Sequence, residues 1–194
     1  MLRILSHASA VIAEGEVNQL TAQRQIDTDE DHYLEIISAK TAALFAAACR
    51  VSPVVAEASE DAELALECYG RNLGIAFQLS DDVIDYASDS ETMGKGVGDD
   101  FRDGKMTLPV IFAYARGNED DRVFWRGAIT GSRISDDDLA HATRLLRNTD
   151  ALADTVERAR QYARRAIDAL AIFPASKSKS ALVEAAEFAV SRAY

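Results

Sequence analysis

The feature that most constrains the fold is the spacing of apolar residues, which recurs at helical intervals along almost the whole chain. Prolines occur only at positions 53, 109 and 174, and each lies where a helix is expected to start or break. No stretch sustains the two-residue alternation of a half-buried strand, so no sheet is predicted. We therefore expect an all-α fold, a multi-helix bundle.

The predicted helices are separated by segments rich in turn residues. The longest of these, 88–105, is rich in Gly and Asp and is predicted to be a loop, and 117–121 is predicted to be a turn. No repeat, low-complexity linker or domain boundary is evident, so residues 1–194 are expected to form a single all-helical domain. The predicted helices cover about 2–22, 30–50, 61–86, 107–116, 136–147, 150–172 and 178–192.

Charge and composition exclude several classes of function. The formal net charge is −11, which argues against a nucleic-acid surface and against electrostatic attachment to an anionic membrane. No segment approaches the roughly 18 to 20 apolar residues that cross a bilayer, and the N-terminus does not resemble a signal peptide. We expect a cytoplasmic protein without a stable membrane anchor. A polyanionic ligand would have to be bound by local cations or by metal ions.

The cysteines and histidines indicate no metal site. Cys49 and Cys68 lie in apolar helical patterns without a CxxC pair, so they are expected to be small buried hydrophobic residues in a reducing compartment. The three histidines, His7, His32 and His141, are scattered along the chain and are interpreted as structural or surface residues.

The strongest chemical signal is FQLSDDVIDY, residues 77–86. Asp81, Asp82 and Asp85 fall within one turn, near the C-terminal end of a long apolar helix, where negative charge is disfavoured. Such a cluster is either a solvated acidic helix end or a site for a hard divalent cation, and Mg²⁺ prefers carboxylate oxygens. The pattern lacks the residue order of an EF-hand loop.

Neighbouring residues favour the second alternative. Lys95 and Lys105 flank a Gly- and Asp-rich loop that starts soon after the aspartates, which is the composition expected of a diphosphate clamp. Lys40 and Thr41 add a cation and a hydroxyl in the middle of an apolar helix. A lysine in that setting most often extends its amine to solvent, so Lys40 alone would indicate little.

Four segments in the same order resemble the trans-polyprenyl diphosphate synthases, and most of all the bacterial octaprenyl- and decaprenyl-type enzymes. They are EGEVNQL (14–20), AKTAALF (39–45), GRNLGIAFQLSDDVIDY (70–86) and GKGVGDDFRDGKMTLPV (94–110). The resemblance covers nearly the whole chain and is strongest from 10 to 115. It implies an all-α bundle of the isoprenoid synthase type around a deep cavity, usually a homodimer.

The resemblance also implies roles for individual residues. Asp81, Asp82 and Asp85 match the second aspartate-rich motif, which holds Mg²⁺ on an allylic diphosphate. Lysines at 40, 95 and 105 match residues that contact that diphosphate, Thr41 and Gln78 match polar groups near the developing allylic cation, and Phe77 matches an aromatic position beside the motif. The implied reaction is head-to-tail condensation of isopentenyl diphosphate with an allylic diphosphate, in isoprenoid (quinone side chain) biosynthesis.

The family's first aspartate-rich motif has no counterpart in this sequence, because its place lies upstream of the matched region. The other acidic clusters, 27–31, 99–103 and 136–138, lie in the wrong places. We expect a chain truncated at the N-terminus and inactive alone, with exposed apolar helix faces that favour oligomerisation. Two alternatives remain: a short subunit that completes or regulates a heteromeric prenyl synthase, and a non-catalytic helical protein that kept the fold.

Overall fold

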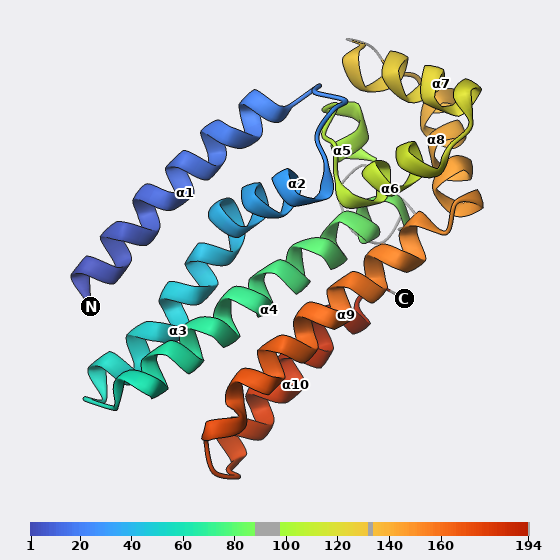
Figure 1. Ribbon diagram of the computed structural model, residues 1–194. Helices are drawn as coiled ribbons and strands as arrows, with labels where there is room; N and C mark the ends of the chain where they lie inside the picture. Colours follow the sequence, from blue (N-terminus) through green and yellow to red (C-terminus); the bar gives the residue numbers. More distant parts are fainter. Residues whose placement is uncertain (88–97, 132–133, 194) are drawn as a thin grey trace.

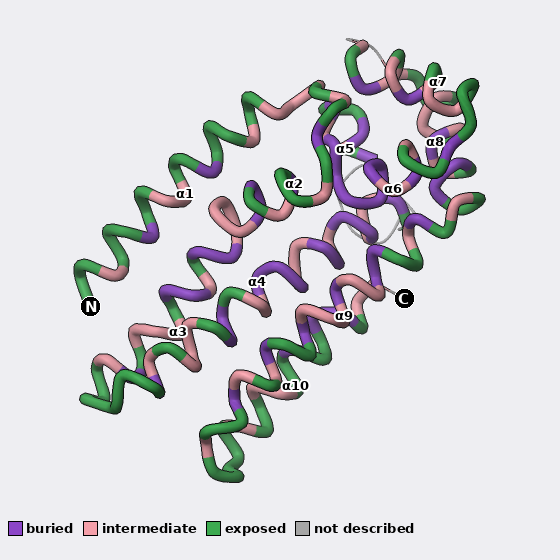
Figure 2. The backbone as a smooth tube through the Cα atoms, viewed as in Figure 1, coloured by how far each residue is buried: buried purple, intermediate pink, exposed green. Residues whose placement is uncertain are grey.

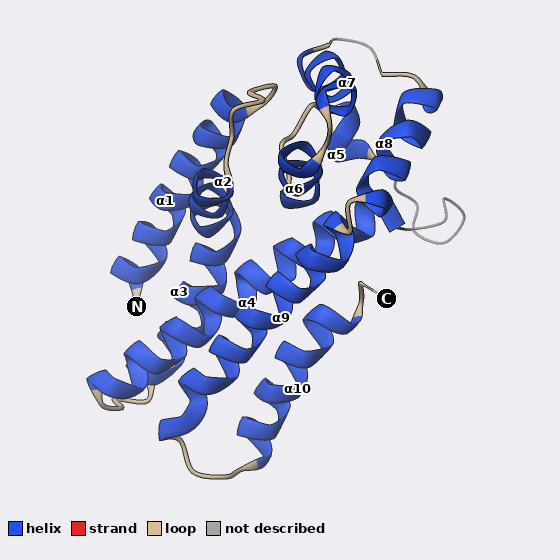
Figure 3. Ribbon diagram, turned by 45° about the vertical axis from the view of Figure 1, so that its right-hand side comes forward, coloured by secondary structure: helices blue, strands red, loops and turns tan. Residues whose placement is uncertain are grey.

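A computed structural model describes residues 1–87, 98–131 and 134–193, and every regular element within these ranges is a helix (Figure 3). The predicted all-α fold is therefore confirmed. The elements are α1 (Leu2–Ala22), α2 (Glu30–Ile37), the π-helical turn η1 (Ser38–Ala42), α3 (Ala43–Val55), α4 (Glu60–Ala87), α5 (Asp99–Arg102), α6 (Leu108–Arg116), α7 (Glu119–Thr130), α8 (Asp136–Asn148), α9 (Ala151–Ala169), the 3₁₀ turn η2 (Leu170–Ile172) and α10 (Lys177–Ser191).

Long helices lie side by side and form most of the molecule (Figure 1). The central one is α4, which packs against α3 on one side and against α9 on the other. At the two edges, α1 packs on η1 and α3, and α10 packs on α9 and α4. The shorter helices α5 to α8 gather at one end, beside the C-terminal end of α4 (Figure 1). This arrangement places the aspartates of α4 between the long helices and the short ones.

The most deeply buried region surrounds that end of α4 (Figure 2). Large side chains from the short helices meet there, including the fully buried Phe101, Trp125 and Leu108. The rings of Phe101 and Trp125 pack edge to face, with centroids 5.8 Å apart, a favourable geometry for an aromatic pair. Because this core is fixed on three helices, it provides a rigid support for the loop that precedes α6.

Two expected boundaries differ from the structure. The predicted helix at 30–50 is interrupted by η1 and then continues to Val55, with Pro53 in its last turn. The predicted loop at 88–105 contains the short helix α5 within its described part.

The predicted turn at 117–121 is wrong from Glu119 onward, because α7 begins there. Asn118 caps this helix: its side chain accepts from the backbone N–H of Asp121, whose carboxylate accepts from the N–H of Asn118 in return. This reciprocal pair is a capping box, which starts a helix immediately after the two turn residues. The acidic residues after Asn118 were therefore a helix-start signal.

The expected burial of both cysteines is wrong for Cys68, which is exposed, while Cys49 is partly buried. Among the described helices, none combines the length and apolar character needed to span a bilayer. The cytoplasmic location stays a prediction.

Candidate functional site

The π-helical turn η1 carries Lys40 and Thr41 and is held in place by α1. A Cβ atom at Gly15 of α1 would lie 2.6 Å from the backbone nitrogen of Lys40 and 2.9 Å from the carbonyl carbon of Ala39. Only glycine permits this close approach of two backbones. π-Helical turns are frequent at functional sites because the extra residue redirects side chains.

The Lys40 amine lies against α1, where it donates to Oε1 of Gln19 and lies 3.4 Å from Oε1 of Glu16. Its side chain is 31% exposed, so it is neither fully solvated nor buried. Both partners belong to the EGEVNQL segment. The amine is therefore held against α1.

A continuous chain of hydrogen bonds links η1 to the aspartates of α4. The Thr41 hydroxyl donates to Oε1 of Gln78 at 3.0 Å, and Nε2 of Gln78 donates to Oδ1 of Asp82 at 2.9 Å. From α2, the Tyr33 hydroxyl donates to Oδ2 of Asp82. The sequence predicted roles for Thr41, Gln78 and Asp82 separately, and the structure brings all three together.

Asp82 is 1% exposed, and burial is the main reason that its pKa rises from 3.8 to about 8. The negative charge of Asp100 raises this pKa further, whereas the hydrogen bonds from Tyr33 and Gln78 lower it. Burial also raises the pKa of Tyr33, with Asp82 as the next cause. In the metal-free protein, Asp82 therefore holds a proton at neutral pH.

Asp85 connects α4 to the short helix α5. Its two carboxylate oxygens accept from the backbone N–H groups of Asp99 and Asp100, each at 3.2 Å. Burial raises the pKa of Asp85 to about 6, and the charge of Asp100 adds to the rise, while the two backbone hydrogen bonds oppose it.

Lys105 lies on the far side of α5. Its amine is 2.8 Å from Oδ1 of Asp100 and 3.0 Å from Oδ2 of Asp103. Burial lowers the pKa of this lysine, but the hydrogen bonds and charges of the two aspartates outweigh burial and raise it. Lys105 is therefore a permanent cation. Asp100 connects it to Asp85, because the Asp100 carboxylate pairs with Lys105 and the Asp100 backbone N–H donates to Asp85.

The segment before Lys105 is fixed by the connection between α1 and α2. The backbone N–H of Arg24 donates to the carbonyl of Gly104 at 2.9 Å, and Nε2 of Gln23 donates to the carbonyl of Asp103 at 2.6 Å. The Arg24 guanidinium also donates to the carbonyl of Gly131, after α7. Arg24 thus connects the loop before Lys105 to the end of α7.

Asp81 faces a different neighbour from the other two aspartates. Its Oδ1 accepts from Nη2 of Arg192 at 3.4 Å, and the Arg192 guanidinium lies 4.6 Å from the centroid of the Phe77 ring. That ring also packs against Phe45 of α3, with centroids 5.6 Å apart. The predicted site residues Phe77 and Asp81 are thus joined by an arginine near the C-terminus.

The three aspartates do not converge on one point. Within the described residues, no group of three or more Asp, Glu, His or Cys side chains could hold a metal ion by itself. Asp81 and Asp85 are partly exposed, whereas both oxygens of Asp82 accept hydrogen bonds. Mg²⁺ is usually held by one or two carboxylates, with water and substrate phosphates completing its shell. The donor set therefore fits a metal shared with a phosphate ligand.

The predicted site residue Lys95 lies outside the described residues.

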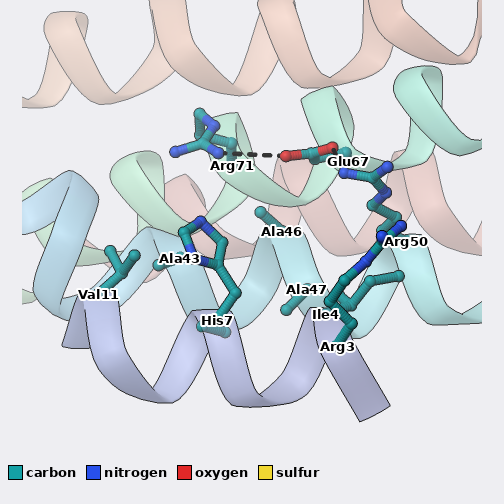
Figure 4. Close-up of a pocket in the computed structure, with 11 residues that line it drawn as sticks. Arg3, Ile4, His7, Val11, Ala43, Ala46, Ala47, Arg50, Glu67 and Arg71 are labelled. Atoms are coloured by element: carbon teal, nitrogen blue, oxygen red, sulfur yellow. Dashed lines mark hydrogen bonds and ion pairs between the residues drawn. The ribbon is translucent and has the colours of Figure 1, made fainter. Parts of the chain in front are cut away.

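A cavity of about 550 Å³ lies along the groove between α1, α3 and α4 (Figure 4). Its wall on α3 is apolar and made of small side chains, Ala43, Ala46 and Ala47, which follow Lys40 and Thr41 along the chain. Arg50, on the same helix, and Glu67, on α4, form an ion pair at 2.8 Å and also line the cavity. Because α3 rises about 1.5 Å per residue, Arg50 lies roughly 15 Å along the helix axis from Lys40.

Sequence reasoning missed three residues that contact the predicted ones: Tyr33, Asp100 and Arg192. Asp100 belongs to the recognised 94–110 segment and could have been selected as the partner of Lys105. Tyr33 and Arg192 lie 49 and 111 residues from the aspartates that they contact, so only the folded chain brings them to the site.

Comparison with known proteins gives one consistent result. The family model described as polyprenyl synthetase matches residues 1–146. Octaprenyl diphosphate synthase of Haemophilus influenzae is 40% identical over 100% of this chain and 59% of its own length. The Escherichia coli octaprenyl diphosphate synthase is 39% identical over 99% of this chain and, again, 59% of its own length.

Solved structures agree. A decaprenyl diphosphate synthase from Rhodobacter capsulatus has a TM-score of 0.93 and 44% identity, and the match covers 100% of this chain and 59% of that one. A polyprenyl synthase from Caulobacter crescentus, complexed with calcium and isoprenyl diphosphate, has a TM-score of 0.95 and 47% identity with the same coverage. The chain thus spans 59% of the length of these relatives.

Proposed function

Because the chain belongs to the polyprenyl synthetase family, we propose that it carries the allylic-diphosphate half of a trans-polyprenyl diphosphate synthase. The reaction is the Mg²⁺-dependent, head-to-tail condensation of isopentenyl diphosphate with an allylic diphosphate. The observation that carries this proposal is the hydrogen-bond chain from Thr41 through Gln78 to Asp82, which links the π-helical turn to the aspartates. This chain places a hydroxyl and an amide beside the carboxylates that are proposed to hold the metal.

In this proposal Asp81, Asp82 and Asp85 hold Mg²⁺, which when bound supplies the positive charge that stabilises a departing diphosphate. The partly exposed Asp81 and Asp85 are suited to ligands shared with substrate oxygens. Asp82 is suited to orienting the bound metal, because Tyr33 and Gln78 fix both of its carboxylate oxygens. The calcium and isoprenyl diphosphate bound by the Caulobacter crescentus relative support the same assignment.

Lysines at 40, 95 and 105 are proposed to bind the diphosphate. For the two that the structure describes, the amines are already oriented by acids or amides, Lys40 by α1 and Lys105 by α5. Exchange of one carboxylate or amide partner for a phosphate oxygen keeps each ammonium paired, so little is lost on binding.

Thr41 and Gln78 are proposed to face the carbon that becomes positively charged as the diphosphate leaves. The Thr41 hydroxyl uses its proton on Gln78, so its oxygen lone pairs remain available to a cation. Phe77 presents an aromatic ring beside the motif, and the Arg192 guanidinium lies over this ring. The prenyl tail is proposed to lie along Ala43 and Ala47, on the apolar wall of the cavity.

Isothermal calorimetry with a non-hydrolysable allylic thiolodiphosphate tests this function directly. We expect binding that requires Mg²⁺ and that weakens at least about tenfold in Asp81→Asn and Asp85→Asn, because each removes a charged ligand. Asp168→Asn is the matched control, since this exposed residue of α9 lies outside the site. Binding that is unchanged without Mg²⁺, or in both site variants, would refute the proposal.

We expect the 194-residue chain alone to show little or no synthase activity, because the resemblance assigns the other half of the metal site to a motif that has no match in this sequence. Robust chain elongation by the purified chain would contradict this expectation. The alternative, a subunit of a heteromeric prenyl synthase, is favoured by one relative: the matching Schizosaccharomyces pombe protein is a subunit 1 of decaprenyl-diphosphate synthase. Co-purification with a partner that restores activity would support that alternative.

A homodimer is proposed on the basis of α1. Beyond the face that packs on η1, this edge helix exposes Leu2, Leu5, Val17 and Leu20, each at least 40% exposed. Exposed apolar side chains gathered on one helix are typical of an association surface. Analytical ultracentrifugation should show a dimer, and Leu5→Glu with Leu20→Glu should dissociate it. A compact monomer at micromolar concentration would contradict this proposal.

A further inference from the structure

The last turn of the chain reaches the aspartate motif. Arg192 immediately follows α10, and its guanidinium donates to Asp81 at 3.4 Å while it lies over the face of Phe77 at 4.6 Å. The two contacts use different parts of the guanidinium: an N–H group at its edge bonds to Asp81, and its flat face lies on the Phe77 ring.

The position of Arg192 is fixed by the helix that carries it. Ala186, Ala189 and Val190 are buried and anchor the end of α10 against the bundle. The side chain of Arg192 is 28% exposed, so it is partly desolvated but still reachable. A guanidinium already held on an aromatic ring loses less conformational entropy when it binds a ligand than a free one does.

The guanidinium has more hydrogen-bonding capacity than its contacts with the described part of the chain use. It carries five N–H donors, and the bond to Asp81 uses one of them. Only one oxygen of Asp81 accepts that bond. Arg192 can therefore remain beside Asp81 while further N–H groups bind oxygens of a phosphate ligand.

We propose that Arg192 is a direct diphosphate-binding residue, which contacts the ligand from the Asp81 side while Lys105 contacts it from the Asp85 side. This inference rests on the function proposed above. A diphosphate near Asp81, Asp82 and Asp85 brings its negative charge to an acidic surface of a chain with net charge −11. Arginine suits that place because it stays charged at every physiological pH and pairs with phosphate through two parallel bonds.

Calorimetric titrations with Mg²⁺ alone and with inorganic pyrophosphate plus Mg²⁺ test this assignment. We expect Arg192→Gln to weaken pyrophosphate binding about tenfold, or about 1.4 kcal/mol. The affinity for Mg²⁺ alone should not fall, because the substitution removes a cation from beside Asp81. Arg192→Lys should lose less affinity for pyrophosphate, because lysine keeps the positive charge although it cannot form two parallel hydrogen bonds to phosphate.

Arg165→Gln is the matched control. Arg165 also lies over an aromatic ring, 4.8 Å from Tyr162, but it is exposed on α9 and contacts no residue of the motif. The control should bind pyrophosphate as the wild-type chain does, and circular dichroism should show that each variant is folded.

Each other result overturns the proposal. Pyrophosphate affinity that is equal in Arg192→Gln and in wild type would show that Arg192 does not touch the ligand. An equal loss of affinity for Mg²⁺ alone in Arg192→Gln would show that the substitution disturbs the metal site and does not remove a contact with the diphosphate. If the wild-type chain binds neither Mg²⁺ nor Mg²⁺–pyrophosphate, the proposed function itself fails, and the assignment of Arg192 fails with it.

Discussion

Replacement of Asp82 by Asn should stabilise the metal-free protein at neutral pH. Burial is the main cause that raises the pKa of this carboxyl from 3.8 to about 8, with a further rise from the charge of Asp100. At pH 7 the folded protein keeps a proton there that the unfolded chain has released. The cost is about 4 kcal/mol, from 1.36 kcal/mol for each of the roughly three pH units between 3.8 and 7.

The raised pKa of Asp82 determines whether stability rises or falls with pH. A carboxyl whose pKa is raised in the folded state favours folding below the ordinary value near 4, and this contribution is lost as the pH rises toward about 8. Asn does not titrate, so the free energy of unfolding of the variant lacks this dependence on pH. It preserves the geometry, because its carbonyl can accept from Gln78 and its amide can donate to the oxygen of Tyr33.

Urea unfolding followed by circular dichroism, with EDTA present and at pH 5, 6, 7 and 8, measures the effect. The free energy of unfolding of the wild-type chain should fall over this range, and Asp82→Asn should exceed it by a margin that grows with pH to a few kcal/mol. Asp168→Asn removes a similar charge from an exposed site and should show no such growth. Parallel profiles for wild type and Asp82→Asn would refute the reasoning.

Three further substitutions test the backbone and the hydrogen-bond chain, each by urea unfolding. Gly15→Ala should lower the free energy of unfolding by about 1–3 kcal/mol, since its methyl group would meet the π-helical turn at 2.6 Å, whereas Gly127→Ala meets open space and should be neutral or stabilising. Thr41→Val should cost about 0.5–1.5 kcal/mol because the Gln78 oxygen loses its donor, and Thr41→Ser should restore most of it. Gly104→Ala should cost about 1–2 kcal/mol from its φ of 72° alone, and should also weaken pyrophosphate binding by displacing the neighbouring lysine; unchanged stability would contradict the left-handed assignment.

The sequence predicted the helices well where periodicity and capping agree. The first helix ends at Ala22 as predicted, and Ser135 caps α8 with its side chain as predicted. Periodicity failed at η1, because a π-helical turn inserts one residue without changing the apolar pattern enough to be seen. What fixes that turn is the approach of Gly15 from α1, and a contact between helices cannot be read from the spacing within either one.

Local sequence also identified the chemical residues better than their partners. Asp82 and Gln78 are one helical turn apart, so their hydrogen bond follows from spacing alone. Tyr33 lies 49 residues away from Asp82, and Arg192 lies 111 residues from Asp81. Such pairs depend on how α2 and α10 pack against α4, which is determined by the whole core.

The same distinction explains how three like charges coexist at the end of one helix. From spacing alone, Asp81, Asp82 and Asp85 should repel one another unless a cation lies among them. The folded chain relieves the repulsion differently at each position: an arginine pairs with Asp81, burial favours a proton on Asp82, and two backbone N–H groups bind Asp85. Under the proposed function, Arg192 stays beside Asp81 while its other N–H groups bind phosphate, and Asp82 releases its proton when a metal binds. The cluster is therefore stable without a ligand, and under the proposed function the partly exposed Asp81 and Asp85 remain accessible to one.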